Sequence, residues 1–466
     1  MHPAAAALRF VPLNSPQPAS GQLPVARQIG YSIAETGINT VETLVRIYLL
    51  IFYTDEVGLG PGLASLAFGL GVVWDAVTDP MMGAISDRTR HRFGGRRGYL
   101  LPGSVLLAGS LLLVFFPPPI EGQFWLFLWL LGSYCALNLG MTVLSVPYMA
   151  MAGELTEDPR TRAALFGWRF AFANVGAVAA VALTRAFLVD GHGSAAALPT
   201  VSMVAAGIVV VSALVTWRAT AAMPRLGRVV RTESWLRTLR TVFASRPLRP
   251  LLAAYVVATI GIGINATTAQ YYYRYLLRLD AAQVESLLLV FLAVFTVSIL
   301  GWVTAAKHYP KLRLMSWGSI LLGIGTAALY LLLPPGAYLA TVVLGGVVLG
   351  SLVGCIVLID ATLTDVIDHD RLRTGQLRSG LYFGLWRFAS KLARALSIGT
   401  AGLVLDVAGF VPNVEQSEGV QWALRLQFGP GVGLFFALAG VILGLYRFDE
   451  RKQDQVRRLL ARREAG

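Results

Sequence analysis

Two carboxylates lie inside an apolar run of this sequence. The segment Val72–Arg97 begins VVWDAVTDPMM, and its residues Asp75 and Asp79 are four positions apart. On a helix this spacing places both side chains on one face, one turn from each other. Thr78 adds a hydroxyl, and Pro80 leaves the carbonyl group four residues earlier without its usual helical donor. These oxygens suit a small cation or a proton shared between neighbouring carboxylates; the alternative is a pair of salt bridges that dock helices.

One lysine has the properties of a partner for these carboxylates. The chain contains four lysines and 35 arginines, and of the lysines only Lys391 lies well inside an apolar segment. A lysine ammonium is a compact charge that can lose its proton when it is buried. We expect Lys391 to occupy the carboxylate site when no cation is bound; the alternative is a fixed structural counterion. Arg387 and Arg394 lie four residues before and three residues after it, which gives one strongly positive helix face.

A third set of polar residues lies within the first apolar segment. Glu35, Asn39, Glu42 and Arg46 are spaced by four, three and four residues, so they form one stripe on a helix. Polar residues inside apolar segments face a bundle interior or a water-filled cavity. The alternative for Glu42 and Arg46 is a local ion pair. With polar residues of later segments, the stripe predicts a site for a polar solute that comprises Asn39, Glu42, Arg46, Arg169, Asp365 and Arg387.

The elements that carry these residues have the composition of membrane spans. Of the 466 residues, 55% are hydrophobic and 14% are charged, whereas a soluble domain has about 25% charged residues. Runs long enough to cross a bilayer recur throughout, and helices satisfy their own backbone groups there. The predicted fold class is an all-α membrane protein with twelve transmembrane helices. Their approximate extents are 29–53, 63–86, 99–116, 123–150, 164–188, 198–218, 250–276, 284–305, 314–333, 338–367, 380–408 and 426–446.

A basic connection, residues 219–249, divides the predicted helices into two six-helix bundles, 29–218 and 250–446. Residues 1–28 are predicted to be a disordered N-terminal tail, and residues 447–466 a basic C-terminal tail. The sequence GWRFAFANVG at 167–176 and the sequence LWRFASKLAR at 385–394 share Trp-Arg-Phe-Ala, and they fall in the fifth and eleventh spans. We interpret this repeat as a duplication, which gives two related bundles around a site at the membrane midplane.

The positive charge is confined to alternate loops. The net charge of +13 resides largely in residues 88–97, 218–249, 307–313, 371–378 and 447–463. This distribution follows the positive-inside rule, places both termini in the cytoplasm and argues against nucleic-acid binding. In the first of these regions, Asp87, Arg88, Arg96 and Arg97 are predicted to form gating ion pairs that break when the bundles rock; the alternative is plain positive-inside charge.

Several other chemistries lack the residues that they need. The chain has no G-x-x-x-x-G-K-[ST] motif for ATP, and its five histidines lie in predicted tails or loops. Its two cysteines, Cys135 and Cys355, lie in apolar spans and give neither a disulfide framework nor metal-ligand spacing. We therefore expect no enzyme, no cofactor and no metal beyond a monovalent cation.

At family level, the segment WDAVTDPMMGAISDRTRHRFGGRRGYLL resembles the second-span signature of the glycoside–pentoside–hexuronide:cation symporters. These proteins are the melibiose-permease branch of the major facilitator superfamily. Further similar segments are YLLIFYTDEVGL, VPYMAM with ELTEDPRTR, YYYRYLL and GFVPNVEQS, so the resemblance extends from about Tyr31 to Arg447. It implies the major facilitator fold, with twelve helices in two bundles that work by alternating access.

The resemblance also implies roles for individual residues. Asp75 and Asp79 fall on the family's cation-binding carboxylates, Thr142 on a threonine associated with that site, and Lys391 on the span-eleven lysine. Arg169 falls on the arginine that contacts the sugar in melibiose permease. With Thr78, which supplies an oxygen where the family usually has asparagine, these residues form the predicted cation site and one part of the substrate site.

The substrate side departs from the sugar permease. Asn39 stands where that protein has an aspartate that holds substrate hydroxyls, and Ser145 stands where it has another acid.

We expect a symporter that couples Na⁺ or H⁺ influx to uptake of a small organic solute, with a glycoside as first choice. The alternative cargo is a lysolipid or another zwitterionic or anionic solute, because sodium-dependent lysophosphatidylcholine symporters share the second-span motif. The remote alternative is a non-transporting sensor. We expect a monomer in the plasma membrane, which would be the inner membrane if the source is a bacterium.

Overall fold

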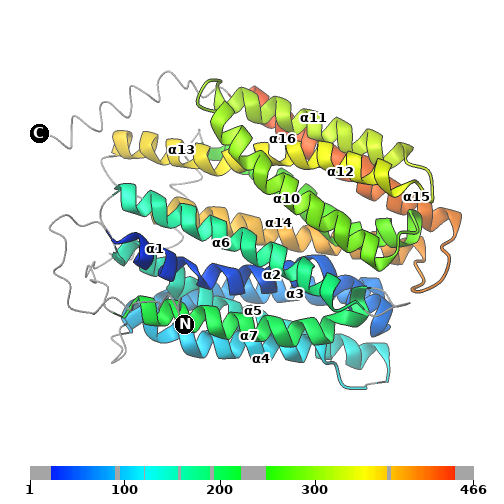
Figure 1. The fold of residues 1–466 in the computed structure, drawn as a ribbon, viewed down its shortest axis with the longest axis horizontal. Coiled ribbons are helices and arrows are strands. Elements are labelled where there is room, and N and C mark those ends of the chain that lie inside the picture. Colours follow the sequence, from blue (N-terminus) through cyan, green and yellow to red (C-terminus); the bar gives the residue numbers. More distant parts are fainter. Residues whose placement is uncertain are drawn as a thin grey trace, which may run out of the picture.

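The computed structural model consists of long helices that run side by side along the longest axis of the molecule (Figure 1). It describes residues 23–89, 95–119, 121–155, 159–188, 194–221, 248–374 and 379–446. The elements of the first half are α1 (Val25–Ser32), α2 (Ala34–Ile51), η1 (Phe52–Glu56), α3 (Pro61–Arg88), η2 (Gly95–Tyr99), α4 (Leu100–Phe115), α5 (Gln123–Leu155), α6 (Pro159–Ala186), η3 (Ser194–Ala197) and α7 (Leu198–Ala219). Those of the second half are α9 (Leu248–Tyr271), η4 (Tyr272–Leu276), α10 (Ala281–Ala305), α11 (Lys311–Leu332), α12 (Leu339–Val353), η5 (Gly354–Val357), α13 (Leu358–Thr374), α14 (Ser379–Ala408), α15 (Glu418–Leu426), η6 (Gln427–Gly431) and α16 (Val432–Leu445).

Within these described ranges, eleven helical segments are long and apolar enough to cross a membrane. The predicted first span corresponds to α1 and α2, which are separated at Ile33. Helix α2 packs against α6 and α7 and so completes the expected twelve, but Glu35, Glu42 and Arg46 make it more polar than the other spans. The twelfth span begins at Glu418 rather than near residue 426, because the amphipathic helix α15 continues directly into η6 and α16. The predicted basic connection and tails lie largely outside the described residues.

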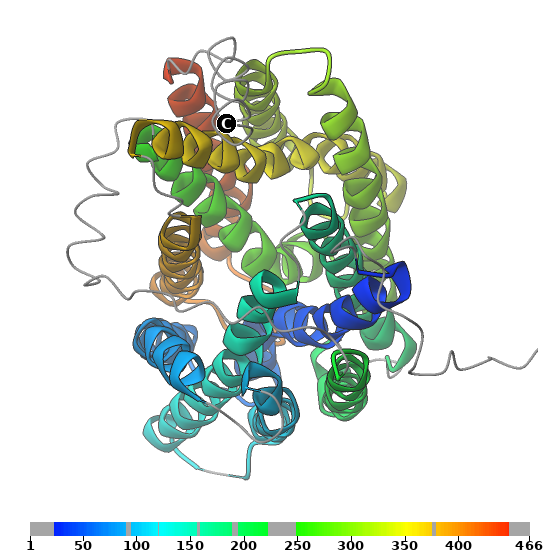
Figure 2. The same cartoon turned by 90° about the vertical axis from the view of Figure 1, so that its left-hand side faces the viewer.

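Equivalent helices of the two halves pack in equivalent pairs. Helix α2 packs against α6 and α7, as α9 packs against α14 and α16. The pairs α3–α5 and α4–α7 likewise correspond to α10–α12 and α11–α16. Viewed from one end, the first half lies mostly below the second half (Figure 2). This packing supports the duplication that the Trp-Arg-Phe-Ala repeat predicts, since α6 and α14 carry the two copies.

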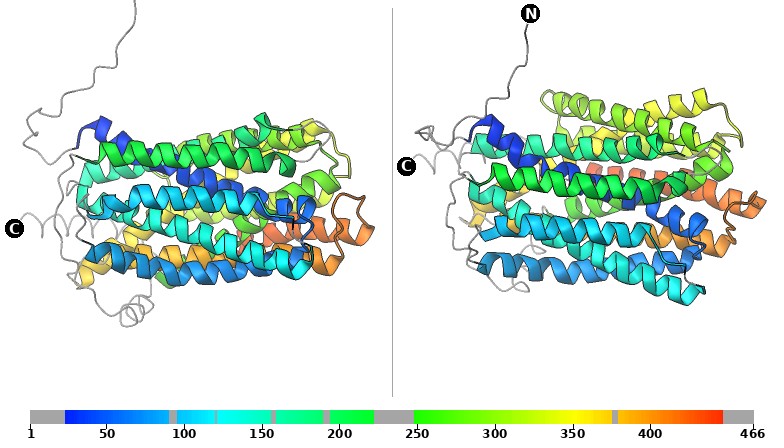
Figure 3. Two further views of the ribbon diagram at one scale, coloured as in Figure 1. Left: turned by 90° about the horizontal axis from the view of Figure 1, so that it is seen from below. Right: turned by 60° about the horizontal axis from the view of Figure 1, so that its bottom comes forward.

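The halves meet along three helix pairs, α3–α14, α6–α10 and α2–α9. Helices of both halves run along most of the length of the molecule (Figure 3). Helix α14 approaches α3 closely at Gly402, where a Cβ atom would overlap the side chain of Ser65 and the carbonyl oxygen of Pro61. Small residues allow such close approach between membrane helices. This contact holds α14, and with it Lys391, beside the carboxylates of α3.

Candidate functional site

Three helices bring the predicted cation residues together. The Nζ atom of Lys391 on α14 lies 2.6 Å from a carboxylate oxygen of Asp75 and forms a shorter ion pair with Asp79, both on α3. The Thr142 hydroxyl on α5 lies 2.9 Å from an oxygen of Asp75 and 2.7 Å from one of Asp79. We call these four residues, Asp75, Asp79, Thr142 and Lys391, the lysine cluster. Two carboxylates and one ammonium give it a net charge of −1.

The lysine cluster is mostly withdrawn from solvent. Asp75 is buried, and the side chains of Asp79 and Lys391 are each 22% exposed. Thr78 is also buried, but its hydroxyl donates to the main-chain oxygen of Asp75 at 3.3 Å. The oxygens that converge with the Lys391 ammonium are those of the two carboxylates and Thr142. A monovalent cation at these oxygens would replace the ammonium of Lys391.

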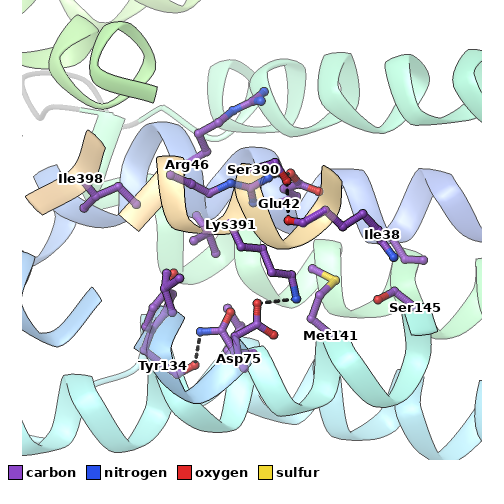
Figure 4. Close-up of a pocket in the computed structure, with 16 residues that line it drawn as sticks. Ile38, Glu42, Arg46, Asp75, Tyr134, Met141, Ser145, Ser390, Lys391 and Ile398 are labelled. Carbon is purple, nitrogen blue, oxygen red and sulfur yellow. Dashed lines mark hydrogen bonds and ion pairs between the residues drawn. The ribbon is translucent and has the colours of Figure 1, made fainter. Parts of the chain in front are cut away.

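A cavity lies beside the lysine cluster, between the two halves of the molecule (Figure 4). Its wall comes from α2, α3 and α5 in the first half and from α14 in the second. The lining residues are Ile38, Glu42, Val45, Arg46, Val72, Asp75, Tyr134, Leu137, Asn138, Met141, Ser145, Arg387, Ser390, Lys391, Arg394 and Ile398. The cavity volume is about 120 Å³, below the roughly 300–1,000 Å³ of ordinary ligand pockets. A sugar-sized solute therefore needs movement of side chains or of the halves.

Charged side chains link the halves across this cavity. Glu42 on α2 pairs with Arg394 on α14 at 2.7 Å, so the alternative of a local ion pair between Glu42 and Arg46 is wrong. In the part of the chain that the structure describes, no carboxylate is within ion-pairing distance of Arg46 or Arg387. The Nε atom of Arg46 is buried without a hydrogen-bond partner. The cavity thus contains two guanidinium groups that form no direct ion pair among the described residues, although the Glu42 carboxylate acts electrostatically on both.

Arg169 and Asn39 belong to a separate cluster outside the lining of this cavity. The Arg169 guanidinium pairs with Glu35, with its Nε atom 2.7 Å from Oε1, and the two side chains are only 9% and 11% exposed. Asn39 donates from Nδ2 to the other carboxylate oxygen of Glu35 at 3.0 Å. The guanidinium also lies over the ring of Tyr148, 5.2 Å from its centroid. The predicted polar stripe of α2 therefore divides into this cluster and the cavity-facing residues Glu42 and Arg46.

Asp365, also predicted for the substrate site, lies elsewhere in the second half. Its carboxylate on α13 is 3.0 Å from Nζ of Lys311 on α11. It is absent from the cavity lining described above. Of the residues predicted to bind a solute, the structure thus brings Glu42, Arg46 and Arg387 to one cavity.

The predicted gating residues are described only in part. Arg96 donates to the main-chain oxygen of Ala150 at 3.2 Å. Arg97 donates to the main-chain oxygen of Trp217 at 2.6 Å and lies over that ring, 4.2 Å from its centroid. These contacts lie within the first half. The side chains of Asp87 and Arg88 are outside the described part of the structure, so their role stays a prediction.

Comparison with known proteins identifies the family. The sequence profile of the family described as MFS/sugar transport protein matches residues 30–450. The chain belongs to this family. It is therefore a multi-pass membrane transporter of the major facilitator superfamily and not an enzyme.

Relatives of this transporter are distant in sequence but similar along their whole length. The transporter is 25% identical over 449 residues to the putative glycoside/cation symporter YagG of Escherichia coli, with 96% of each chain covered. It is 24% identical over 450 residues to the isoprimeverose transporter of Lactiplantibacillus pentosus, covering 93% of this chain and 92% of that protein. A crystal structure of a bacterial homologue of the human lysosomal transporter Spinster, inward-facing and unoccupied, has a TM-score of 0.64 at 14% identity and covers 91% of this chain and 98% of its own. That likeness shows the fold.

The transporter is closed at the end that carries η1 and η4, away from α1, and we call this the outer end. Two π-helical turns meet there, η1 after α2 and η4 after α9. Asp55 accepts hydrogen bonds from Arg274 at 2.8 Å and from Tyr275, and the hydroxyls of Thr54 and Tyr271 are 2.7 Å apart. Burial raises the pKa of the Asp55 carboxyl, while the Tyr275 hydrogen bond and the Arg274 charge act in the opposite direction. The turns η1 and η4 hold equivalent places in the two halves, each after the first long helix of its half.

The polar cavity residues Tyr134, Asn138, Ser390 and Arg394 of the transporter were not predicted to belong to the site. Their spacing from Thr142 and Lys391 along the sequence could have identified them. Tyr134 and Asn138 precede Thr142 by eight and four residues, so all three share one face of α5. Ser390 and Arg394 flank Lys391 on α14 by one and three residues. The missed residues are therefore close to a predicted cation ligand on the same helix, and three of them lie on its face.

Proposed function

We propose that this transporter is a symporter in which inward flow of Na⁺ or H⁺ drives uptake of a small, sugar-like solute by alternating access. Relatives named as a glycoside/cation symporter and an isoprimeverose transporter support the solute class. The observation that carries the proposal is the ammonium of Lys391 between Asp75 and Asp79. A site that holds a lysine ammonium between two carboxylates is a site that a coupling cation can take over.

The geometry supports a simple coupling mechanism. Lys391 belongs to the second half, and Asp75 and Asp79 belong to the first half, so their ion pairs tie the halves together. A cation at the carboxylates, or a proton on one of them, weakens these ion pairs and releases Lys391 toward the adjacent cavity. Solute binding and cation binding then influence the same interface. By thermodynamic linkage, each ligand raises the affinity of the other by the same factor.

Two further aspects of the proposal concern the membrane. We infer that the termini face the cytoplasm, because the basic loops follow the positive-inside rule, and that the outer end faces outward. We also propose that one chain is the working unit in a bacterial inner membrane, since a single chain supplies both walls of the cavity. The charged wall favours a polar solute over a lysolipid, which needs an extended apolar surface for its acyl chain.

The test is uptake by purified protein in liposomes under an inward Na⁺ gradient, and separately under an inward H⁺ gradient. In wild-type protein, one gradient should accelerate uptake of a radiolabelled glycoside. Asp75→Asn should abolish that acceleration, because it removes one of the two cation-binding charges. Asp406→Asn, which changes an exposed carboxylate near the outer end of α14, is the matched control and should behave as wild type. Gradient-driven uptake by Asp75→Asn at the wild-type rate would contradict the proposal.

A further inference from the structure

Helix α14 brings two cationic side chains to the cavity beside the lysine cluster. Lys391 and Arg394 are three positions apart, so they share one face of the helix, and both line the cavity. They contact different helices of the first half. Lys391 lies 2.6 Å from Asp75 on α3, whereas Arg394 lies 2.7 Å from Glu42 on α2. Two sets of ion pairs, about one helical turn apart, therefore hold α14 to the first half.

Glu42 has room for a second cation. A carboxylate has about four lone-pair sites on its two oxygens. Arg394 contacts Oε1 of Glu42, and no residue in the described part of the chain donates a hydrogen bond to Oε2. The Glu42 side chain is 30% exposed, and it faces the same cavity as Lys391 (Figure 4). One oxygen of this carboxylate is therefore open to a donor that comes from the cavity.

Lys391 needs a counter-charge when a coupling cation replaces it. Its side chain is only 22% exposed, and a charge withdrawn from water is costly unless it is paired. The acidic side chains among the residues that line the cavity are those of Asp75 and Glu42. Glu35, on the same helix as Glu42, is already paired with a buried guanidinium group and is 11% exposed. Glu42 is therefore the carboxylate placed to accept the displaced ammonium.

We propose that Glu42 is a positioning residue for the coupling cation. Oε2 of Glu42 receives the ammonium of Lys391 when Na⁺ takes its place between Asp75 and Asp79, or when a proton neutralises one of these aspartates. The flexible four-carbon stem of lysine allows this move by rotation of the side chain. Arg394, one turn along α14, shows that a side chain from this face reaches Glu42.

The exchange changes which helices are paired. Before it, Lys391 links α14 to α3, and after it, Lys391 links α14 to α2, so the two halves remain connected while the cation is bound. By stabilising the displaced ammonium, Glu42 raises the affinity of the aspartates for the cation. This inference rests on the proposed symport and adds a residue that sets the cation affinity of the same site.

The test is a double-mutant cycle on cation binding to purified protein without solute. The probes are Na⁺ and Li⁺, measured by calorimetry or thermal shift, and proton uptake is measured if neither metal ion binds. Glu42→Gln retains the size of the side chain and removes its charge. It should weaken cation binding about threefold or more, because groups in contact have measurable interaction energies. Glu415→Gln, which changes a carboxylate that is 75% exposed on the outer surface, is the matched control and should retain the wild-type affinity.

A second background separates acceptance of the ammonium from simple attraction of the cation. A carboxylate that acts only through its charge attracts the cation whether or not Lys391 is present. If Glu42 acts through Lys391, Glu42→Gln should change the cation affinity by a factor close to one in Lys391→Gln protein. Lys391→Met provides a second neutral background, and melting temperatures check that each variant folds. An equal loss of affinity with and without Lys391, or no loss in either, would overturn the proposal.

The result is distinguishable from failure of the proposed function. Wild-type cation affinity in Glu42→Gln, together with cation-driven uptake, would reject the role of Glu42 and leave symport intact. The expected cycle without any effect of a cation gradient on uptake would reject symport and leave the exchange of Lys391 intact. Wild-type protein that binds none of the three cations would overturn both.

Discussion

Intramembrane arginines of this chain have two different environments. Arg169 is buried, paired with Glu35 and covered by the ring of Tyr148. Arg46 and Arg387 line the central cavity without a carboxylate partner among the described residues. The family resemblance assigns Arg169 to the substrate, whereas the contacts show a guanidinium that is already satisfied by the protein. In this conformation Arg169 stabilises the first half, whereas Arg46 and Arg387 are the arginines that line the central cavity without an ion pair.

At the residue scale, Glu35→Gln should lower stability, because it leaves the Arg169 cation buried without a counter-charge. Removal of one partner from a buried ion pair typically costs about 3–5 kcal/mol. The measurement is thermal unfolding of the purified protein in detergent. Glu415→Gln is the matched control, because Glu415 and Arg278 are 75% and 60% exposed and such pairs contribute about 0–1 kcal/mol. An unchanged melting temperature for Glu35→Gln, with loss of solute binding, would show that Glu35 and Arg169 serve the substrate.

Two short π-helical turns close the molecule at the outer end. η1 and η4 follow the first helix of each half and present Asp55 and Arg274 to each other, with Asn413 donating from Nδ2 to the main-chain oxygen of Asp55 at 2.8 Å. The side chain of Asp55 is fully shielded, and that of Arg274 is 27% exposed. This closure has to break when the cavity opens outward. The contact joins elements that are far apart in sequence, so it acts on the relative position of the halves.

At the element scale, Arg274→Ala should shift the transporter toward conformations that are open at the outer end. The variant removes the ion pair and leaves the buried Asp55 carboxylate without a cation. Spin labels at Glu56 and Glu418, both exposed at the outer end, would report the distance between the halves by pulsed electron resonance. The longer-distance population should grow in Arg274→Ala and remain at the wild-type level in Arg278→Ala, which lacks only an exposed pair. Identical distance distributions for Arg274→Ala and wild type would refute the closure.

Over the whole molecule, the sequence patterns predict most of the fold and part of the site. Hydropathy predicts the spans because a membrane helix must be apolar over its full length, and the second-span motif predicts the carboxylates that Lys391 contacts. The break at Ile33, the π-helical turns and the pairing of Asp55 with Arg274 were not predicted, because they depend on the three-dimensional packing of the halves. The pairing of Glu42 with Arg394 was missed for the same reason, since spacing along one helix indicates only local partners such as Arg46.

Under the proposed symport, coupling between the two ligands is a property of the whole molecule, because the lysine cluster and the cavity both bridge its halves. Linkage requires that the cation change the solute affinity by the factor by which the solute changes the cation affinity. Loss of the carboxylates that hold Lys391 should remove the effect.

The most direct measurement is therefore the dissociation constant of the solute with and without the coupling cation, and of the cation with and without the solute, on one protein preparation. We predict equal factors greater than one in wild-type protein and a factor of one in the Asp75→Asn/Asp79→Asn double variant. Folding of the double variant is checked by its melting temperature and by solute binding without the cation. Solute affinity that is the same with and without Na⁺ and at every pH in wild-type protein would contradict the account.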